Sequence, residues 1–307
     1  MNFLKTTFLT VLLVAFSLST WAQEENVEEI ALTAEEMNML MYMDSVEKAM
    51  AYDTSGSVIA LKGDIADIVV PQGFKYLNPE QSKYILTEVW GNPNGETLGM
   101  LFKNDAGIFF DDSYAINITY DESGYISDEN ANDMDYNELM EEMKASTAEE
   151  NEARKEAGYG TMDIIGWASE PYYDPATKKL HWAKELFFEG SDANTLNYNL
   201  MVLGRKGYLE LNFISDIQQL DMVKNDIPAI IPNVNFKDGY RYDQFDASID
   251  KVAAYGIGGL IAGKILAKTG FFAILAKFGK VIFLGLAAIG GGIVKFFRGN
   301  KQEKENA

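Results

Sequence analysis

One long apolar run near the C-terminus constrains what this chain can fold into. Residues 252–297 are mostly apolar, and the basic residues Arg298, Lys301 and Lys304 follow them. As a helix, residues 281–297 would reach about 25 Å, which is just enough to cross a thin hydrocarbon core. We therefore expect a membrane-associated or transmembrane region over residues 246–298, with membrane lipid as its partner and a basic tail at 299–307.

The number of membrane spans stays open. Residues 252–276 are long enough for a second helix, but lysines interrupt the apolar run at Lys264, Lys268, Lys277 and Lys280. Charged side chains are costly inside a bilayer, so we expect this part to lie at the interface or to insert only partly.

Charge is divided sharply along the chain. Residues 251–307 contain nine Lys or Arg and two Glu, and Lys5 is the only charged residue before Gln23, so residues 23–250 hold 16 basic and 44 acidic side chains. Their net charge is −28, against −20 for the whole chain. The positive-inside rule then predicts a cytoplasmic C-terminus and an acidic domain outside. Nucleic acid is not an expected partner of such an acidic domain.

The first 22 residues have the pattern of a secretory signal peptide. Lys5 supplies an early positive charge, residues 8–18 are apolar, and the small residues Thr20 and Ala22 precede Gln23. The apolar part is short for a membrane span, which favours cleavage over an uncleaved anchor. We expect an inner-membrane protein of a bacterial cell, with its domain in the periplasm.

Cysteine is absent and there is a single histidine. These counts exclude disulfides, thiolate metal sites and multi-histidine metal sites, and no metal or cofactor is expected. His181 remains a weak catalytic candidate, as a general base beside Glu185 or Glu170. The alternative is a structural strand histidine beside Trp182.

The central residues predict an α+β domain, an antiparallel sheet flanked by helices, over residues 57–245. A helical segment over 23–56 precedes it, with a Thr33/Glu36 capping box and methionines as core filler. Strand alternation is clearest at 112–120, which suggests a sheet with one buried face, and residues 196–213 predict a hairpin around Gly204–Gly207. Helices are expected at 79–90, 135–157 and 216–230.

The stretch EVWGNPNGETLGMLF, residues 88–102, places Trp90 and Asn92 at a corner between two apolar segments. Gly91 can cap the helix and Pro93 stops its continuation, so the stretch predicts a rigid turn. The alternative is that Trp90 and Asn92 line a binding pocket beside the sheet.

A second candidate binding loop lies in the stretch GYISDENANDMDYNELM. Asp128, Asn130 and Asn132 alternate as in a calcium loop, but Asp133 replaces the required glycine and Leu139 the required glutamate. A helix N-terminus capped by Asp135 explains the pattern better, with loose cation binding at Asp128–Asp133 as the alternative.

Small residues four apart recur in the apolar C-terminal run and let helices approach closely. They predict self-association of the chain through this region, at three pairs: Gly259 with Gly263, Ala287 with Gly291, and Ala288 with Gly292.

Several segments together resemble a family of uncharacterised bacterial membrane-anchored proteins with a domain of unknown function. The segments are VPQGFKYL, WGNP followed by GMLF, GYISDENA, GWASEPYYDP, LHWAKEL, LNYNLMVLGRKGYLELN and DKVAAYGIGGLIAGKILAKTG. The resemblance implies an exported domain held by C-terminal hydrophobic segments, and it brings no catalytic residues. The order of elements also looks like the sandwich of the extrinsic proteins of the photosystem oxygen-evolving complex, by analogy alone.

The function expected from these observations is non-enzymatic binding or scaffolding at the envelope, with a membrane protein as partner. The alternatives are a hydrolase-like enzyme that uses His181 and nearby carboxylates, and a membrane oligomer assembled through the tail.

Overall fold

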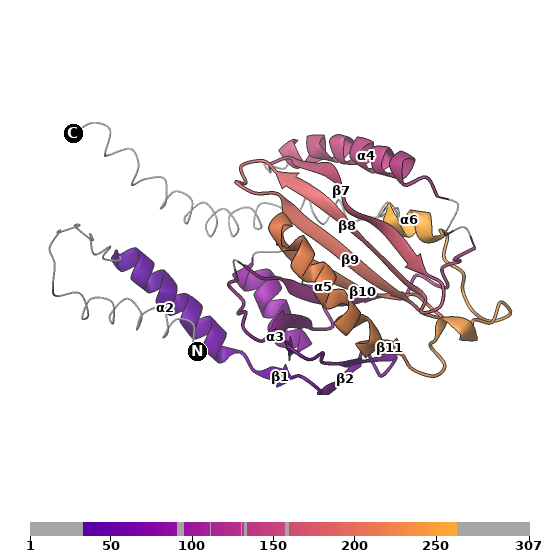
Figure 1. Cartoon of the computed structure of the whole chain (residues 1–307), viewed down its shortest axis with the longest axis horizontal. Coiled ribbons are helices and arrows are strands. Elements are labelled where there is room, and N and C mark those ends of the chain that lie inside the picture. Colours follow the sequence, from indigo (N-terminus) through magenta and orange to yellow (C-terminus); the bar gives the residue numbers. More distant parts are fainter. Residues whose placement is uncertain are drawn as a thin grey trace, which may run out of the picture. The chain divides into compact units, whose positions relative to one another are not determined.

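The computed structural model describes residues 33–90, 95–110, 112–129, 131, 134–156 and 160–262. The chain divides into two units, Met1–Asp44 and Ser45–Ala307. The second unit contains the sheets and every described helix except most of α2 (Ala34–Ala49), which crosses the division. Figure 1 shows the elements in chain order.

The central element is an eight-stranded sheet in which all neighbours are antiparallel. Its strands, in spatial order, are β1 (Tyr52–Thr54), β4 (Phe74–Leu77), β5 (Met100–Lys103), β6 (Ala115–Asp121), β10 (Tyr208–Asp216), β9 (Thr195–Leu203), β8 (Lys179–Phe188) and β7 (Met162–Asp174). A smaller antiparallel sheet contains β11 (Val234–Phe236), β3 (Ala66–Val69) and β2 (Val58–Leu61). The predicted α+β class with an antiparallel sheet is confirmed, as is the hairpin at Gly204–Gly207.

Two of the three predicted helices begin where their capping residues place them. Asn78 caps α3 (Pro79–Tyr84) by accepting from Gln81 N at 3.0 Å, and α3 continues as the π-helix η1 (Ile85–Val89). Asp135 Oδ1 accepts from the backbone N–H of Asn137 and Glu138 at the start of α4 (Tyr136–Glu156). The third helix, α5 (Leu220–Ile230), is preceded by the 3-10 turn η2 (Ile217–Gln219).

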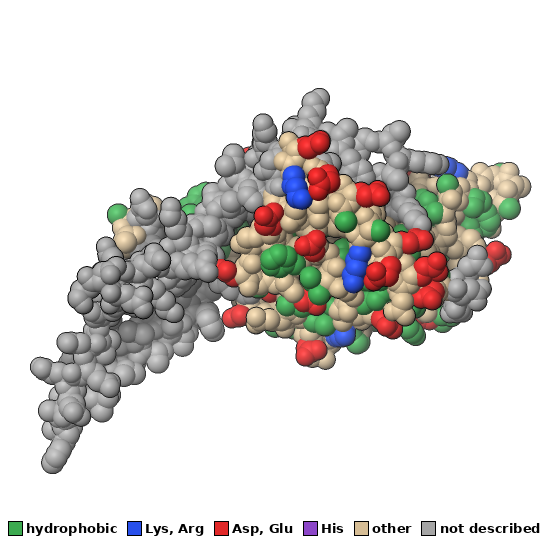
Figure 2. Space-filling view, turned by 90° about the horizontal axis from the view of Figure 1, so that it is seen from above, with side chains coloured by type: hydrophobic (Ala, Val, Ile, Leu, Met, Phe, Trp, Pro, Cys, Tyr) green, Lys and Arg blue, Asp and Glu red, His purple; other side chains and the backbone are tan. Residues whose placement is uncertain are grey.

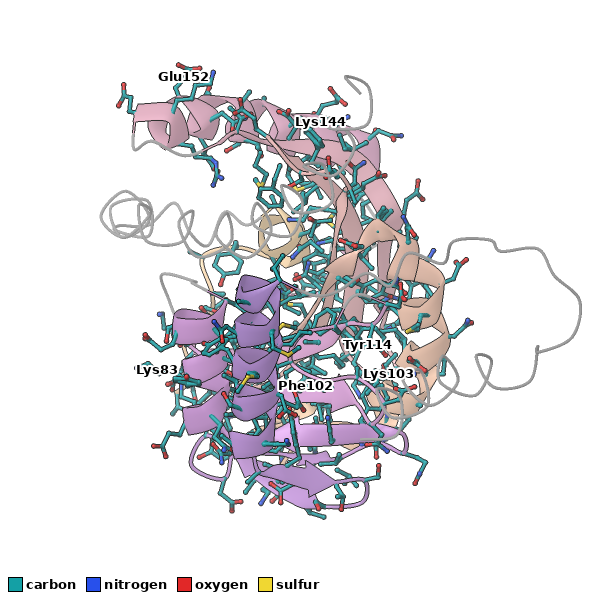
Figure 3. The ribbon with its side chains drawn as sticks, turned by 90° about the vertical axis from the view of Figure 1, so that its left-hand side faces the viewer. Lys83, Phe102, Lys103, Tyr114, Lys144 and Glu152 are labelled. Atoms are coloured by element: carbon teal, nitrogen blue, oxygen red, sulfur yellow. The ribbon has the colours of Figure 1, made fainter. Side chains whose placement is uncertain are left out.

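One face of the large sheet carries the main apolar core. Leu209, Leu211 and Phe213 of β10 alternate toward this face and are fully buried. The apolar side of α5 covers it with Val223, Ile227 and Ile230, and the small sheet joins the same cluster. Seen along the sheet edge in Figure 3, α5 lies on the opposite side of the sheet from α3. We refer to this α5-covered side as the first face.

The opposite side, the second face, is also covered, so the prediction of a single buried face is wrong. At one end Leu77, Met100 and Phe102 pack under α3 and η1. At the other end Leu180, Trp182 and Met201 pack under α6 (Ile257–Ile261) and the start of α4. Segments distant in sequence supply both covers, which strand alternation does not reveal.

β7 contains the sequence Pro-Tyr-Tyr, which is more typical of a turn than of a strand. Pro171, Tyr172 and Tyr173 are in the strand, and the turn begins only after Asp174. Proline is tolerated because β7 is an edge strand, and its pairing with β8 shifts register at three places.

The methionines of α2 do not fill a core. Met37, Met39 and Met41 are 47%, 43% and 63% exposed, whereas Val46 near the end of the helix is buried. The prediction of core filler is therefore wrong for these three side chains. Thr33 lies directly before the same helix, where Met37 N donates to Thr33 O, and the Thr33/Glu36 capping box stays a prediction.

Most of the predicted targeting and membrane segments fall outside the described residues. These include the leader at 1–22 and the apolar residues 263–298. Among the helices that the structure describes, none combines the length and apolar character that a membrane crossing needs. Of the small-residue pairs, only Gly259 is described; it lies in α6, where an added Cβ would come within 2.7 Å of Tyr255 Cβ.

One partly buried polar contact fastens α5 to the sheet. Asp226 Oδ2 accepts from Tyr114 Oη at 2.6 Å and from Lys103 Nζ at 2.8 Å; Figure 3 labels Tyr114 and Lys103 beside α5. We expect Asp226→Ala to lower the free energy of unfolding by about 2 kcal/mol, because it removes two hydrogen bonds to a carboxylate. Urea unfolding checks this against Asn225→Ala, an exposed position one residue earlier, where a change within about 0.5 kcal/mol is expected. Equal effects of the two substitutions would contradict this role.

Candidate functional site

A row of polar side chains crosses the middle of the second face. The register pairs Asn117 of β6 with Asn212 of β10, Asn212 with Asn199 of β9, and Asn199 with Trp182 of β8. Directly paired residues point to the same face of a sheet, so the four side chains form one line across four strands. We call these four residues the polar row.

The position of the polar row follows from strand alternation. Asn117 lies between Ile116 and Ile118, and Asn212 between Leu211 and Phe213, whose apolar side chains turn to the first face. Period-two geometry therefore sends each asparagine to the second face. Asparagine is depleted in strands, so three of them in one lateral line are not explained by strand propensity.

The polar row is largely enclosed. Asn199 is 5% exposed and Trp182 is 2% exposed, while Asn117 and Asn212 are half-buried. Hydrogen bonds join its centre through Asn197, which donates to Asn212 Oδ1 at 3.1 Å and accepts from Asn199 Nδ2 at 2.9 Å. These bonds orient the central amides.

The two ends of the row hold polar atoms that lack partners. Among the described residues, Trp182 Nε1 and Asn117 Oδ1 are buried atoms without a hydrogen-bond partner. One is a donor at the β8 end and the other an acceptor at the β6 end. A buried polar atom left unpaired costs about 1–3 kcal/mol, so both ends of the row lower the stability of the fold.

Opposite charges flank the polar row. Lys184 lies two residues after Trp182 in β8, and Glu210 lies two residues before Asn212 in β10. Burial lowers the pKa of Lys184, an effect that Glu210 and Glu150 of α4 oppose. Burial also raises the pKa of Glu210, which Lys184 opposes. A half-buried amine and a half-buried carboxyl therefore flank the row on its two sides.

His181 lies on the first face, away from the polar row. Its Nδ1 is 2.7 Å from Tyr198 Oη, and its ring meets Tyr172 edge to face. Burial lowers the pKa of His181, and Asp174 partly opposes this shift. Glu185 accepts from Asn194 instead, and no hydrogen bond or ion pair in the described part of the chain joins His181 to Glu185 or Glu170.

Asp128 forms a hydrogen-bonded centre within the fold. Its Oδ2 accepts from Tyr173 Oη at 2.5 Å and Lys178 Nζ at 2.8 Å, and its Oδ1 accepts from Tyr242 Oη at 3.0 Å. Lys178 also lies 5.0 Å from the centre of the Tyr242 ring. These donors engage the oxygens that a cation would need; the other loop candidates, Asn130, Asn132 and Asp133, are outside the described residues.

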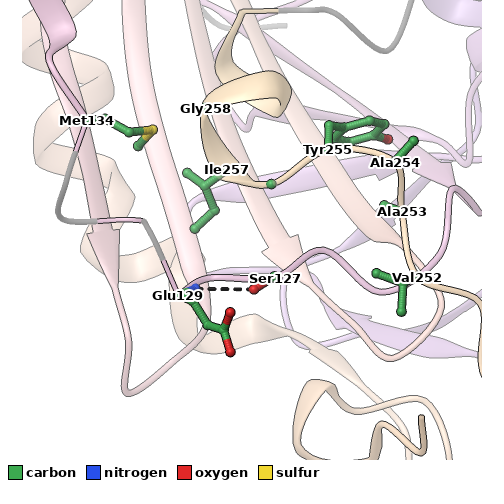
Figure 4. A pocket seen from close by; sticks show the side chains of 10 residues that line it. Ser127, Glu129, Met134, Val252, Ala253, Ala254, Tyr255, Ile257 and Gly258 are labelled. Atoms are coloured by element: carbon green, nitrogen blue, oxygen red, sulfur yellow. Dashed lines mark hydrogen bonds between the residues drawn. The ribbon is translucent and has the colours of Figure 1, made fainter.

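A shallow pocket of about 500 Å³ lies beside this loop (Figure 4). Its walls come from Ser127, Glu129 and Met134 on one side and from residues 252–258 on the other. Among the described residues that line it, Glu129 is the only charged one, and the backbone N–H of Glu129 donates to Ser127 Oγ at 3.4 Å. The pocket therefore has fewer polar side chains that could bind a ligand than the polar row has.

Trp90 ends η1 and packs edge to face against Phe110, with ring centres 6.1 Å apart. Trp90 and Phe110 both pack against the apolar cluster under α3 and η1. Its proposed pocket partner Asn92 is outside the described residues, so that pairing stays a prediction.

Acidic side chains do not mark a site. On the face shown in Figure 2 they are scattered among other side chains rather than gathered in one patch. Within the described residues, no group of three or more His, Cys, Asp or Glu is arranged to hold a metal ion.

Sequence reasoning missed the polar row, although its signal was present. The segments AINITY, HWAKEL, LNYN and ELNF place Asn, Trp, Lys and Glu at alternate strand positions. Alternation predicted that these side chains share a face. It did not predict that helices cover that face.

Comparisons with known proteins give a family and one distant structural likeness. The family model described as "Protein of unknown function (DUF2167)" matches residues 53–290. No curated protein matches the chain. Among the solved structures that match is the solution structure of cyanobacterial PsbP (CyanoP) from Synechocystis sp. PCC 6803, at 13% identity and a TM-score of 0.32 over 60% of this chain and 98% of that chain. At this TM-score, the expected sandwich of the photosystem extrinsic proteins stays an analogy.

The unpaired acceptor of Asn117 gives a stability test of the polar row. We expect Asn117→Leu to raise the free energy of unfolding by about 1 kcal/mol, because it removes a buried unpaired acceptor and adds apolar contact beside Met100. Asn225→Leu, at an exposed position of α5, is the matched control and should change stability by less than about 0.5 kcal/mol. A loss of stability in Asn117→Leu would show that Asn117 serves the fold.

The Asp128 centre predicts a pH-dependent contribution to stability. Burial disfavours the charge of Asp128, but hydrogen bonds from Lys178, Tyr173 and Tyr242 outweigh this and hold its pKa below the usual range. A lowered folded-state pKa gives stability that is present above the unfolded-state pKa, about 3.9, and is lost as pH falls through the folded-state value. Asp128→Asn should cost about 2 kcal/mol at pH 7.

Urea unfolding of Asp128→Asn and of the unmodified chain, from pH 7 to pH 3, checks this contribution. The difference between the two proteins should shrink as pH falls below about 4. A constant difference over the whole range would mean that the carboxylate charge is not what stabilises this centre.

Proposed function

The chain belongs to the DUF2167 family of proteins of unknown function, and we propose that it is a non-enzymatic binding module of the bacterial envelope. Its polar row is the proposed binding surface. One observation carries this proposal: a line of asparagines, of which Asn117 and Asn212 are only half-buried, crosses the middle of the second face between its two apolar ends.

The energetic argument compares the two faces of the same strands. On the first face, Ile116, Leu211 and Tyr198 pack in an apolar core that favours folding. On the second face, the neighbouring positions Asn117, Asn212 and Asn199 bury polar groups, and two of the row's atoms remain unpaired. Apolar residues of similar size would be neutral or stabilising there. Retaining amides at a cost in stability supports a binding role.

The geometry favours binding over catalysis. General acid–base work needs a titratable group within hydrogen-bond reach of the substrate, and a nucleophile needs an adjacent base. The polar row presents three amides and an indole, and Lys184 and Glu210 flank it without forming such a pair. His181, the candidate for a hydrolase-like enzyme, is hydrogen-bonded to Tyr198 on the other face.

Export and tethering are part of the proposal and are supported by the sequence. A leader at 1–22 would deliver the acidic domain to the periplasm, and the apolar residues 263–297, which follow α6 in the sequence, would hold it at the inner membrane. The described sheet would then meet its partner, an envelope protein, close to the membrane surface.

Site-specific photo-crosslinking in cells tests the binding surface. A photoreactive amino acid replaces Thr119, which pairs with Glu210 beside the polar row, and in a second protein it replaces Lys224, exposed on α5 at the opposite side of the sheet. A discrete adduct is expected from position 119 and not from position 224. Combining Asn117→Leu with position 119 should reduce the adduct about fivefold, the effect of one lost hydrogen bond.

The same adducts from positions 119 and 224 would contradict the proposal. So would an adduct at position 119 that is unchanged by Asn117→Leu, because the row would then take no part in binding.

A further inference from the structure

We propose that the first turns of α2 are a site of methionine oxidation, at which the chain consumes hydrogen peroxide without loss of its fold. The site comprises Met37, Met39 and Met41. It lies outside the polar row, so it adds an activity to the proposed binding function and does not depend on it.

Exposure separates these three methionines from the others in the described part of the chain. Met41 is 63% exposed, and Met37 and Met39 are 47% and 43% exposed. The remaining described methionines are half-buried or buried, and Met100 and Met201 lie in apolar clusters at 0% and 4% exposure. An oxidant must reach the thioether sulfur to react with it. The three methionines of α2 therefore react before those of the core.

Helix geometry spreads the three sulfur atoms around α2. Residues four apart in a helix lie on the same face, and residues two apart point to nearly opposite sides. Met37 and Met41 are therefore neighbours, and Met39 projects from the other side of the helix. An oxidant meets a thioether on either side of these turns.

The core of the domain does not depend on these side chains. The last turn of α2 belongs to the second unit, where Val46 is buried in an apolar cluster and Met50 packs against the same cluster. In contrast, Met37, Met39 and Met41 belong to none of the apolar clusters that the described residues form. A sulfoxide is polar and disrupts a core, but it can stay hydrated at an exposed position.

Each of the three side chains consumes one molecule of hydrogen peroxide. The sulfur donates a lone pair to one peroxide oxygen, so that an S–O bond forms as the O–O bond breaks. The proton of the transferred oxygen passes to the departing hydroxide, which leaves as water. The thioether is oxidised by two electrons to the sulfoxide, and the peroxide is reduced.

Peptide mapping by mass spectrometry tests the site on the purified full chain after timed exposure to dilute hydrogen peroxide. Sulfoxide should form at all three positions of α2 at least about tenfold faster than at Met100 and Met201, because the core excludes the oxidant. At the dose that converts the three side chains, the urea midpoint of unfolding should be unchanged.

A variant that combines Met37→Leu, Met39→Leu and Met41→Leu tests the consumption of peroxide. Leucine keeps the helix propensity of methionine and cannot form a sulfoxide. This variant should lose the fast phase of peroxide consumption. Met222→Leu, at a half-buried position of α5, is the matched control and should keep that phase. If the triple variant fails to fold, peptide mapping of the unmodified chain decides the question.

Similar rates at all methionines would overturn the proposal, because exposure would then not direct the oxidation. Slow reaction at the three positions of α2 would also overturn it, since their sulfur atoms would be covered in the full chain. So would a lower urea midpoint when only these three side chains are oxidised. None of these results changes the crosslink from position 119, which tests the proposed binding function separately.

Discussion

The register between β6, β10, β9 and β8 is the constraint on which the rest of the structure depends. In a β-strand, successive side chains point to opposite faces, so a slip of one residue exchanges the two faces completely. In the observed register, Ile116, Leu211 and Phe213 meet α5, and Asn117, Asn212 and Asn199 line up on the other side. A shift by one position would bury the asparagines in the main core.

The first face stabilises the fold, and the second face carries the proposed binding surface. The first face holds the largest apolar cluster and is fastened by the contact of Asp226 with Tyr114 and Lys103. On the second face, apolar contacts lie at the two ends of the sheet, under α3 and η1 and under α6. Its middle can therefore carry polar groups, because the fold does not depend on apolar packing there.

Sequence patterns predicted the strands and helix ends, because these depend on residues that are close together along the chain. Alternation at 114–120 and 209–213 located β6 and β10, and Asp135 predicted the start of α4. What the patterns could not supply were contacts between distant segments. Asp128 meets Tyr173 and Tyr242, 45 and 114 residues away, and the second face is covered by elements from separate parts of the sequence. The calcium-loop spacing of Asp128, Asn130 and Asn132 did not predict that Asp128 accepts hydrogen bonds from the two tyrosines.

The same limit explains why the polar row was missed. Asn117, Asn199 and Asn212 each look like a solvated strand position when read alone. Only the pairing of four strands places them in one line, and only α4 and α6 make the neighbourhood of Trp182 a buried one.

Nuclear magnetic resonance of the indole N–H groups tests the central claim most directly. In a full chain with nitrogen-labelled tryptophan, the signals of Trp90 and Trp167 serve as internal references for that of Trp182. The account predicts that adding a bound partner moves the Trp182 signal downfield, as its unpaired donor gains an acceptor, while the Trp167 signal stays in place. A Trp182 signal unchanged by a partner that demonstrably binds would contradict the account.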